Sequence, residues 1–457
     1  MLTGLGESDA ARFARIAFLW HSRGKLSFDE VGYQIRTSTL YLQLEKLALD
    51  HHVAMHSLPT LVNWVNVVFG TACSVALYVL FRKLTTRPVA VTATLIHAIT
   101  PGFWLGNVFG MPTVPGLLFF VLGLVAFVSA TQAPATKVGL YLRLALAWLF
   151  MSTAMTLKSD LALSGGAFLA AALARPTQRW RFAIYAVAVV VGGTLASLAY
   201  TRLVVLPSKE AVTPGVGLIA FLKDWNASFA VSLDALLTDS NNTVIPRCVG
   251  GLLFGVIVLS VLYGLVVGGR PRKQAILALM WALPPILGWG IRFGNSTRHN
   301  VPAFPPLILL ATIFLFDLAK QDTRRATALV VALMGLSYFS NTSGEEALKP
   351  QSNLLALTAV VERRTQNTHA RARDLAQSPG QKRVVIAGYA DAWTEFEVLS
   401  DGQNPKIGDS TDHMTIIDGE RITIIDYDAY LGHKSAKAMA RRYRAQGYEI
   451  LSLSYRL

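Results

Sequence analysis

Long runs of apolar residues alternate with short polar segments between residues 61 and 341. A helix that crosses a hydrocarbon core of about 30 Å needs about 20 mostly apolar residues. Ten runs approach that length: 61–81, 88–107, 112–131, 139–157, 161–175, 182–205, 248–268, 274–293, 301–319 and 325–341. The pattern predicts an α-helical polytopic membrane protein with about ten spanning helices, although the second and fifth runs are short or interrupted.

The segments beside these runs are polar to amphipathic. Within residues 1–60, helical spacing is found from Ala10 to Trp20 and again from Leu40 to Leu49. Residues 206–247 form a long connection within the transmembrane domain, which we place at residues 61–344. Segments of this kind either lie at the membrane interface and shape a site there, or serve as solvated connectors.

The C-terminal part, residues 345–457, has the composition of an ordinary soluble domain. Strand patterns run from Arg383 to Ala387, from Arg421 to Asp426 and from Tyr448 to Ser454, with helical runs between them. This alternation predicts a small C-terminal α/β soluble domain. It has neither a phosphate loop nor a GxGxxG sequence, so we assign it no catalysis.

The charges orient the chain in the membrane. Only 15% of the residues are charged and the formal net charge is +14, against about 25% charged residues in soluble proteins. The basic loops hold Arg82, Lys83 and Arg87; Lys137; Arg175, Arg179 and Arg181; Arg270, Arg272 and Lys273; and Lys320, Arg324 and Arg325. They fall at alternate helix ends, which predicts that these ends face the cytoplasm. We expect the membrane to be the inner (plasma) membrane of a bacterial cell. Positive charge in short loops between apolar runs excludes nucleic acid as the partner.

This orientation places the N-terminal segment and the C-terminal domain outside the cytoplasm, in the periplasm or an equivalent space. An outer segment of about 60 residues normally follows a signal peptide or a first spanning helix. Met1 stands only a few residues before the first polar motif of the chain. We therefore expect a further spanning helix upstream of this start.

Four short motifs lie on the predicted outer side of the membrane. They read Glu7-Ser8-Asp9-Ala10-Ala11-Arg12-Phe13, Thr100-Pro101-Gly102-Phe103-Trp104, Leu157-Lys158-Ser159-Asp160 and Thr297-Arg298-His299-Asn300-Val301-Pro302. In order, spacing and side, this set resembles the type C glycosyltransferase (GT-C) superfamily. It is similar to the protein O-mannosyltransferases and the aminoarabinose–lipid A transferases. The resemblance covers most of residues 1–320.

The resemblance implies a glycosyltransferase that moves a hexose or a pentose from a polyprenyl-phosphate-linked donor. The acceptor would be a lipid, a glycan or a protein on the outer face of the membrane. Such chemistry needs a carboxylate to activate the acceptor or orient the sugar, and cations to hold the leaving phosphate. Asp9 holds the acidic motif position and is the implied catalytic residue, with helix capping as its alternative role. The donor phosphate is assigned to Arg298, His299, Lys158 and Arg292, and further substrate contacts to Glu7 and Arg36.

The outer loop 107–112 departs from the family, because many members carry a second acidic residue there and this loop has none. Either Asp9 works alone, or Asp160 or Asp239 replaces the missing acid, or the protein binds no metal at that place. The two cysteines lie in or at the edge of apolar runs, without metal-ligand spacing. We assign no cofactor and no metal ligand, and we leave a divalent metal ion open.

Two other functions stay open. A transporter or flippase often shows internal repeats and charges in mid-membrane, whereas the polar groups here gather at the outer face. Asp317 is the only acid near a helix interior, and it lies at the predicted cytoplasmic end. A catalytically silent scaffold of the same fold would explain the missing second acid. Cations at helix ends that merely reach for the interface would fit that scaffold as well.

Overall fold

A computed structural model of the chain describes residues 28–53, 57–100, 111–132, 136–174, 178–204, 251–267, 269–290, 301–340, 383–387, 413–418, 421–426 and 449–452, with a few single positions within 13–24, at 103 and within 441–447. The chain divides into two compact units. The smaller comprises residues 1–25, 42–65 and 355–457, and the larger comprises residues 26–41 and 66–354.

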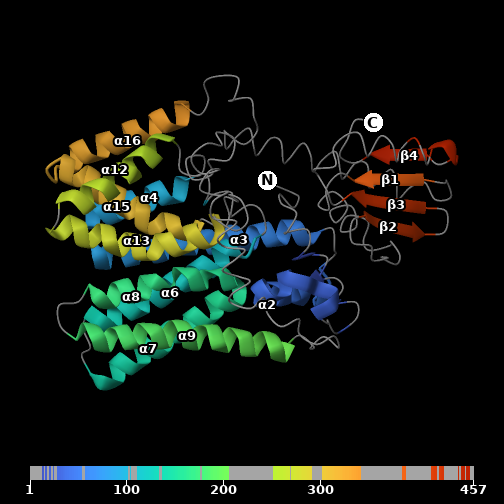
Figure 1. Ribbon diagram of the computed structural model, residues 1–457, viewed down its shortest axis with the longest axis horizontal. Coiled ribbons are helices and arrows are strands. Elements are labelled where there is room, and N and C mark those ends of the chain that lie inside the picture. Colours follow the sequence, from blue (N-terminus) through green and yellow to red (C-terminus); the bar gives the residue numbers. More distant parts are fainter. Residues whose placement is uncertain are drawn as a thin grey trace, which may run out of the picture. The chain divides into compact units, whose positions relative to one another are not determined.

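The larger unit is a bundle of helices (Figure 1). Two helices contribute residues to both units, α2 (Phe28–Asp50) and α3 (Leu58–Leu84). The others are α4 (Arg87–Ile99), α6 (Thr113–Gln132), α7 (Lys137–Leu157), η2 (Ser159–Gly165), α8 (Gly166–Leu173), α9 (Arg179–Val204), α12 (Gly251–Val267), α13 (Gly269–Gly290), η3 (Val301–Ala303), α15 (Phe304–Leu318) and α16 (Thr323–Ser340).

Five described helical segments are long and apolar enough to cross a membrane: Thr60–Leu84, Thr113–Gln132, Lys137–Leu157, Arg179–Val204 and Val301–Leu318. Each coincides with a run for which the sequence predicts a spanning helix. The chain is thus a multi-pass helical membrane protein, while the number of ten spans stays a prediction.

Two of the predicted spans are not one continuous α-helix in the described residues. The run 88–107 forms α4, which ends at Ile99 because Thr100 precedes Pro101 and has extended backbone angles. A residue before proline disfavours the helical conformation. The run 161–175 begins as the 3-10 helix η2, and its α-helical part, α8, has eight residues.

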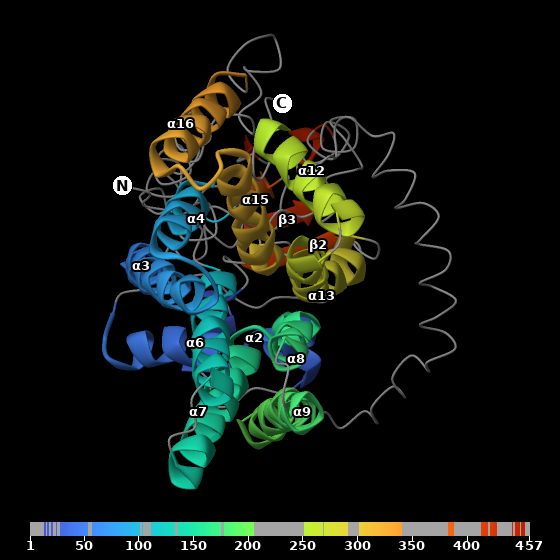
Figure 2. The ribbon, with the colours of Figure 1, turned by 90° about the vertical axis from the view of Figure 1, so that its left-hand side faces the viewer.

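Two apolar segments form the centre of the bundle. In α6, 72% of the apolar 18-residue stretch is buried inside the protein, and in Val301–Leu318 this share is 78%. In α7 it is 28%. Figure 2 shows α7 at the edge of the bundle. On α8, a Cβ at Gly166 would lie 2.1 Å from the carbonyl oxygen of Met280 in α13. Only glycine permits this approach of two backbones, which sets the spacing of α8 and α13.

The smaller unit contains a four-stranded sheet in the order β2-β3-β1-β4. Its strands are β1 (Arg383–Ala387), β2 (His413–Asp418), β3 (Arg421–Asp426) and β4 (Glu449–Ser452). Strand β1 is parallel to β3 and β4, and β2 pairs antiparallel with β3. Three strands fall where the sequence predicts them, and β2 was not predicted. That residues 345–457 form a separate α/β domain stays a prediction.

Candidate functional site

The helices of the larger unit bring two sets of turns to opposite ends. At one end, the start of α6 packs closely against the junction of α7 and η2. A Cβ at Gly116 would lie only 3.0 Å from the Cβ of Lys158. The 3-10 helix η3 packs against η2 and α6 there. We call this the Lys158 end. At the other end, the side-chain amide of Gln132 donates to the carbonyl oxygen of Lys83, 2.9 Å away, and we call this the basic end.

Lys158 lies where α7 stops and η2 begins. Its backbone turns from helical to extended angles, and its N–H donates to the carbonyl oxygen of Ala154. Its side-chain Nζ lies 2.9 Å from Oδ2 of Asp160, and the two side chains are only 9% and 12% exposed. The structure therefore joins the predicted phosphate contact and an alternative acid of the sequence analysis into one nearly buried ion pair.

This pair limits how the Lys158 side chain could contact a phosphate. Burying two charges is costly in free energy, and their attraction offsets that cost only with good geometry. A lysine ammonium has three N–H donors, so Nζ is able to contact a phosphate while it keeps the carboxylate. A phosphate next to Asp160 would meet its negative charge as well. The structure thus shows the ammonium group of Lys158 already paired with the carboxylate of Asp160.

Buried polar contacts tie α2 to the rest of the larger unit. The hydroxyl of Tyr41 donates to Oδ1 of Asn66 on α3 at 3.5 Å, and Nδ2 of Asn66 donates to the carbonyl oxygen of Met111 at 2.9 Å. Thr39 shares a hydrogen bond of 2.8 Å with Thr201 of α9. Because Met111 lies two residues before the start of α6, these contacts hold this part of α2 at the Lys158 end. Arg36 lies on α2 about one and a half turns before Tyr41.

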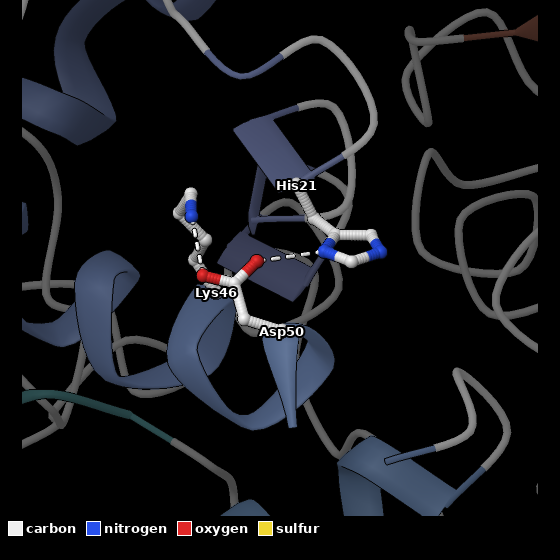
Figure 3. A network of polar contacts seen from close by, with 3 residues as sticks. All are labelled: His21, Lys46 and Asp50. Carbon is white, nitrogen blue, oxygen red and sulfur yellow. Dashed lines mark hydrogen bonds and ion pairs between the residues drawn. The ribbon is translucent and has the colours of Figure 1, made fainter. Parts of the chain in front are cut away.

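In the smaller unit, one carboxylate has two cationic partners. Oδ1 of Asp50 lies 2.8 Å from Nδ1 of His21, and Oδ2 contacts Nζ of Lys46. Figure 3 shows the carboxylate between these two groups, with the other ring nitrogen of His21 turned away from it. The hydrogen bond from His21, followed by that from Lys46, lowers the pKa of Asp50. Lys46 also lies 6.0 Å from the ring centre of Trp20.

Glu45, the neighbour of Lys46 in the sequence, is 3% exposed. Among the residues that the structure describes, neither of its carboxylate oxygens has a hydrogen-bond partner. Burial raises the pKa of Glu45 well above its usual value, because desolvation disfavours the charged form. The smaller unit therefore holds one solvated carboxylate and, five residues earlier, a buried one that favours its protonated form.

Most of the other candidate residues lie outside the described residues: Glu7, Asp9, Asp239, Arg292, Arg298 and His299. For Arg36 the structure gives the backbone position alone. Val301 follows His299 by two residues and begins η3, which packs against η2. The structure thus brings the segment that follows Arg298 and His299 to the 3-10 helix that follows Lys158.

The sequence analysis missed the His21–Asp50 contact and the burial of Glu45. No local signal predicts the first, since 29 residues separate the two partners. For the second, a signal is present in α2, where Leu42 and Leu49 flank Glu45 at helical spacing and are buried like it. Within the described part of the chain, no three His, Cys, Asp or Glu residues form a group that could hold a metal ion.

A model of the dolichyl-phosphate-mannose-protein mannosyltransferase family matches residues 50–200. The fold is similar to that of ArnT from Cupriavidus metallidurans bound to undecaprenyl phosphate, with a TM-score of 0.56, 14% identity, and coverage of 87% of this chain and 81% of that one. It is also similar to the oligosaccharyltransferase of Archaeoglobus fulgidus in the apo form, with a TM-score of 0.52 and 13% identity. That match covers 88% of this chain and 60% of the oligosaccharyltransferase. A comparison with the sequences of curated proteins gave no match.

Both similar structures are type C glycosyltransferases, and the fold of this chain is similar to theirs. The resemblance that rested on four short motifs is thereby confirmed at the level of the superfamily. At these identities the similarity extends to the fold alone. The chain spans 60% of the length of the archaeal oligosaccharyltransferase.

Proposed function

We propose that this chain, which has the type C glycosyltransferase fold, is a membrane enzyme that transfers a hexose or pentose from a polyprenyl-phosphate donor to a lipid, glycan or protein. The observation that carries the proposal is the match, over 87% of the chain, to the fold of a transferase structure that holds undecaprenyl phosphate. The family model over residues 50–200 supports the same reaction class, because its members act on dolichyl-phosphate mannose.

In the proposed reaction, a nucleophilic group of the acceptor attacks the anomeric carbon of the donor sugar. The bond between that carbon and the phosphate oxygen breaks, and the polyprenyl phosphate leaves with the electron pair. Asp9 accepts the proton of the acceptor as a general base. The reaction needs no second group to protonate the leaving phosphate, because the phosphate leaves as an anion that cations of the protein bind.

We assign the leaving phosphate to the Lys158 end of the bundle. Arg298 and His299 lead into η3, which packs against η2. This supports a site shared with Lys158, whose Nζ has donors beyond its contact with Asp160. We assign Arg292 to the same phosphate, and Glu7 and Arg36 to further substrate contacts. Arginine suits phosphate because its planar fork donates two parallel hydrogen bonds.

The proposed orientation puts the Lys158 end, the N-terminal segment and the C-terminal domain outside the cytoplasm, in the periplasm of a bacterial cell envelope. The basic loops at the opposite end support it. A cysteine introduced at Ser410 tests the orientation. We expect an impermeant thiol reagent to label it from the outer side of sealed vesicles, and labelling from the cytoplasmic side alone would overturn the proposal.

Transfer is tested with the purified full chain in lipid nanodiscs. Radiolabelled hexoses and pentoses on undecaprenyl phosphate serve as donors, and an envelope extract supplies the acceptors. We expect label to move from one donor into the extract. Asp9→Asn keeps the size and the capping ability of the side chain, so that loss of the base alone should lower the rate by roughly 10²–10⁴-fold.

The matched control is Asp322→Asn at the basic end, where the side chain accepts from the backbone N–H groups of Arg324 and Arg325. Asparagine preserves this capping role, so the control should transfer like the wild type. Transfer by Asp9→Asn within about twofold of the wild type would remove Asp9 from the mechanism. If no donor is used although undecaprenyl phosphate binds, the chain is a silent scaffold.

A further inference from the structure

A cavity of about 330 Å³ lies in the larger unit at the basic end. It is lined by parts of α6, α8, α13 and α15 and by the turn between α3 and α4. The lining residues that matter here are Lys83, Gln132, Ala171, Gln274, Trp281 and Ile313. Its volume falls at the lower limit of small-molecule sites, which span about 300–1,000 Å³. Nothing in the proposed transfer reaction uses this cavity.

The cavity is long and narrow along the helix axes. On α6 its lining runs from Leu124 to Gln132, and on α8 from Ala167 to Ala174. At 1.5 Å per residue these stretches measure about 12 and 10 Å. That is roughly a third of a hydrocarbon core of about 30 Å. On α15 the lining runs from Pro306, three residues after η3, to Ile313. The cavity therefore extends from the basic end into the bundle.

Small side chains on α8 make this space. Four alanines of that segment line it: Ala167, Ala170, Ala171 and Ala174. The deep part is closed by Trp281, which is 5% exposed and packs on Phe120 with ring centres 5.7 Å apart. A wall of alanines, leucines and an indole ring offers contacts for a hydrocarbon chain. Figure 2 shows α8, α13 and α15 side by side around this region.

The mouth of the cavity is cationic. Lys83 lines it and is exposed, and Arg82 and Arg87 are exposed in the same turn. Arg272 and Lys273 are exposed just before the lining residue Gln274. Two described acids, Asp317 and Asp322, follow the lining part of α15. Asp317 accepts a hydrogen bond from Gln321 at 2.6 Å, and Asp322 lies 3.3 Å from Arg325. Positive charge thus prevails over negative charge around the opening.

We propose that this cavity binds one acyl chain of an anionic phospholipid, with the lipid phosphate beside Lys83. The apolar lining suits the chain, since burial of each methylene is favourable by about 0.8 kcal/mol. The cationic mouth suits the headgroup of a lipid from the leaflet at the basic end. The donor tail fits less well, because its phosphate is assigned to the opposite end of the bundle. The bound lipid fills the space that α8 leaves between α6, α13 and α15.

Two variants test the two halves of the site, on the full chain purified in detergent. Ala171→Phe fills the cavity, and Lys83→Gln removes the cation at its mouth. Ala188→Phe is the matched control, because Ala188 is an exposed alanine of α9 that does not line the cavity. The probes are phosphatidylglycerol, phosphatidylcholine and undecaprenyl phosphate, and their binding is measured by native mass spectrometry and by the shift in melting temperature.

We expect the wild type and Ala188→Phe to bind phosphatidylglycerol more tightly than phosphatidylcholine. Ala171→Phe should weaken phosphatidylglycerol binding at least tenfold. Lys83→Gln should weaken it about fivefold, which corresponds to about 1 kcal/mol for one lysine at an anionic surface. Undecaprenyl phosphate should still bind to both variants, and this separates the lipid site from the proposed donor site.

Three results would overturn the proposal. Unchanged phosphatidylglycerol binding by Ala171→Phe would show that the lipid lies elsewhere. Equal affinity for the two phospholipids, unaffected by Lys83→Gln, would remove the anionic headgroup from the site. Loss of undecaprenyl phosphate binding in Ala171→Phe would assign the cavity to the donor tail. If Ala171→Phe does not fold, Ile313→Trp fills the same cavity from α15 and replaces it in each comparison.

Discussion

In the part of the chain that the structure describes, an aspartate lies beside a lysine at two places, which differ in burial. At the Lys158 end of the larger unit, Lys158 and Asp160 form a pair whose side chains are 9% and 12% exposed. In the smaller unit, Asp50 contacts Lys46 and His21 with its own side chain 35% exposed. The residue types are nearly the same, but water solvates one group of charges and hardly reaches the other.

The difference in burial predicts which of the two clusters can lose a charged side chain without loss of stability. A solvated ion pair contributes little to stability, because water replaces a lost partner. In a buried pair, removal of one charge leaves the other in surroundings of low dielectric constant, where no water compensates it. We therefore expect the Lys158 pair to stabilise the fold, in addition to its proposed role at the phosphate, and the Asp50 cluster to respond mainly to pH.

The largest effect is expected from Lys158→Ala. It removes the cation next to the nearly buried Asp160 carboxylate, and breaking a buried pair in this way costs about 3–5 kcal/mol. Lys46→Ala, the equivalent change in the exposed cluster, should cost less than about 1 kcal/mol. Equilibrium unfolding of the purified proteins measures both, with the exposed Lys137→Ala as the control. Equal losses for Lys158→Ala and Lys46→Ala would refute the distinction by burial.

The next effect concerns Asp160→Asn. Asparagine still accepts a hydrogen bond from Lys158 but carries no charge. We expect a loss of stability of about 1.5–3 kcal/mol, the value of a hydrogen bond to a charged group. If Nζ of Lys158 also contacts the donor phosphate, removal of the competing carboxylate should tighten the binding of undecaprenyl phosphate. Weaker binding in this variant, measured at a temperature at which it stays folded, would exclude Lys158 from the phosphate site.

A third change, Glu45→Gln, concerns the buried acid that lies five residues before the solvated Asp50. The raised pKa means that folded protein binds more protons at Glu45 than unfolded protein does, so stability falls as the pH rises above the usual carboxyl pKa of about 4.3. Glutamine carries no charge to desolvate. We expect a higher melting temperature for the variant at pH 7 and no difference near pH 4. A lower melting temperature at pH 7 would show that the ionised carboxylate is needed.

The smallest effect is expected from Asp50→Asn, and its pH dependence is opposite in sign. The lowered pKa of Asp50 means that its contacts with His21 and Lys46 stabilise the protein above the usual carboxyl pKa of about 3.9. This contribution is lost as the pH falls through the lowered value. The variant should melt slightly below the wild type at pH 7 and together with it near pH 3. A gap that widens on acidification would contradict this assignment.

Several features of the structure follow from local sequence. The spans at α3, α6, α7, α9 and α15 are predicted by apolar runs of sufficient length, since a membrane helix satisfies its own backbone hydrogen bonds. Strands β1 and β3 follow from short β-branched runs between polar segments. Hydropathy alone does not show that α4 ends at Ile99 within the run 88–107, because it does not weigh the effect of Pro101 on the preceding residue.

The candidate site was predictable only in its residue types. That Lys158 and Asp160 stand two residues apart is visible in the sequence, but their mutual contact and burial depend on α6, η2 and η3 packing around them. His21 and Asp50 are brought together across 29 residues, for which no periodic pattern exists. Local patterns report which face of an element is apolar, and they do not report which distant element covers it.

The sequence by itself determined that this protein is a membrane protein, which end of its bundle is basic, and that it resembles the type C glycosyltransferases. The tertiary structure decided what hydropathy cannot distinguish. Lipid and protein interior are both apolar, so the sequences of α6 and α7 both predict a spanning helix. Yet 72% of the apolar stretch of α6 is buried in protein, against 28% of that of α7. For the same reason, four alanines of an ordinary apolar segment became the wall of a cavity only once α13 and α15 had packed opposite them.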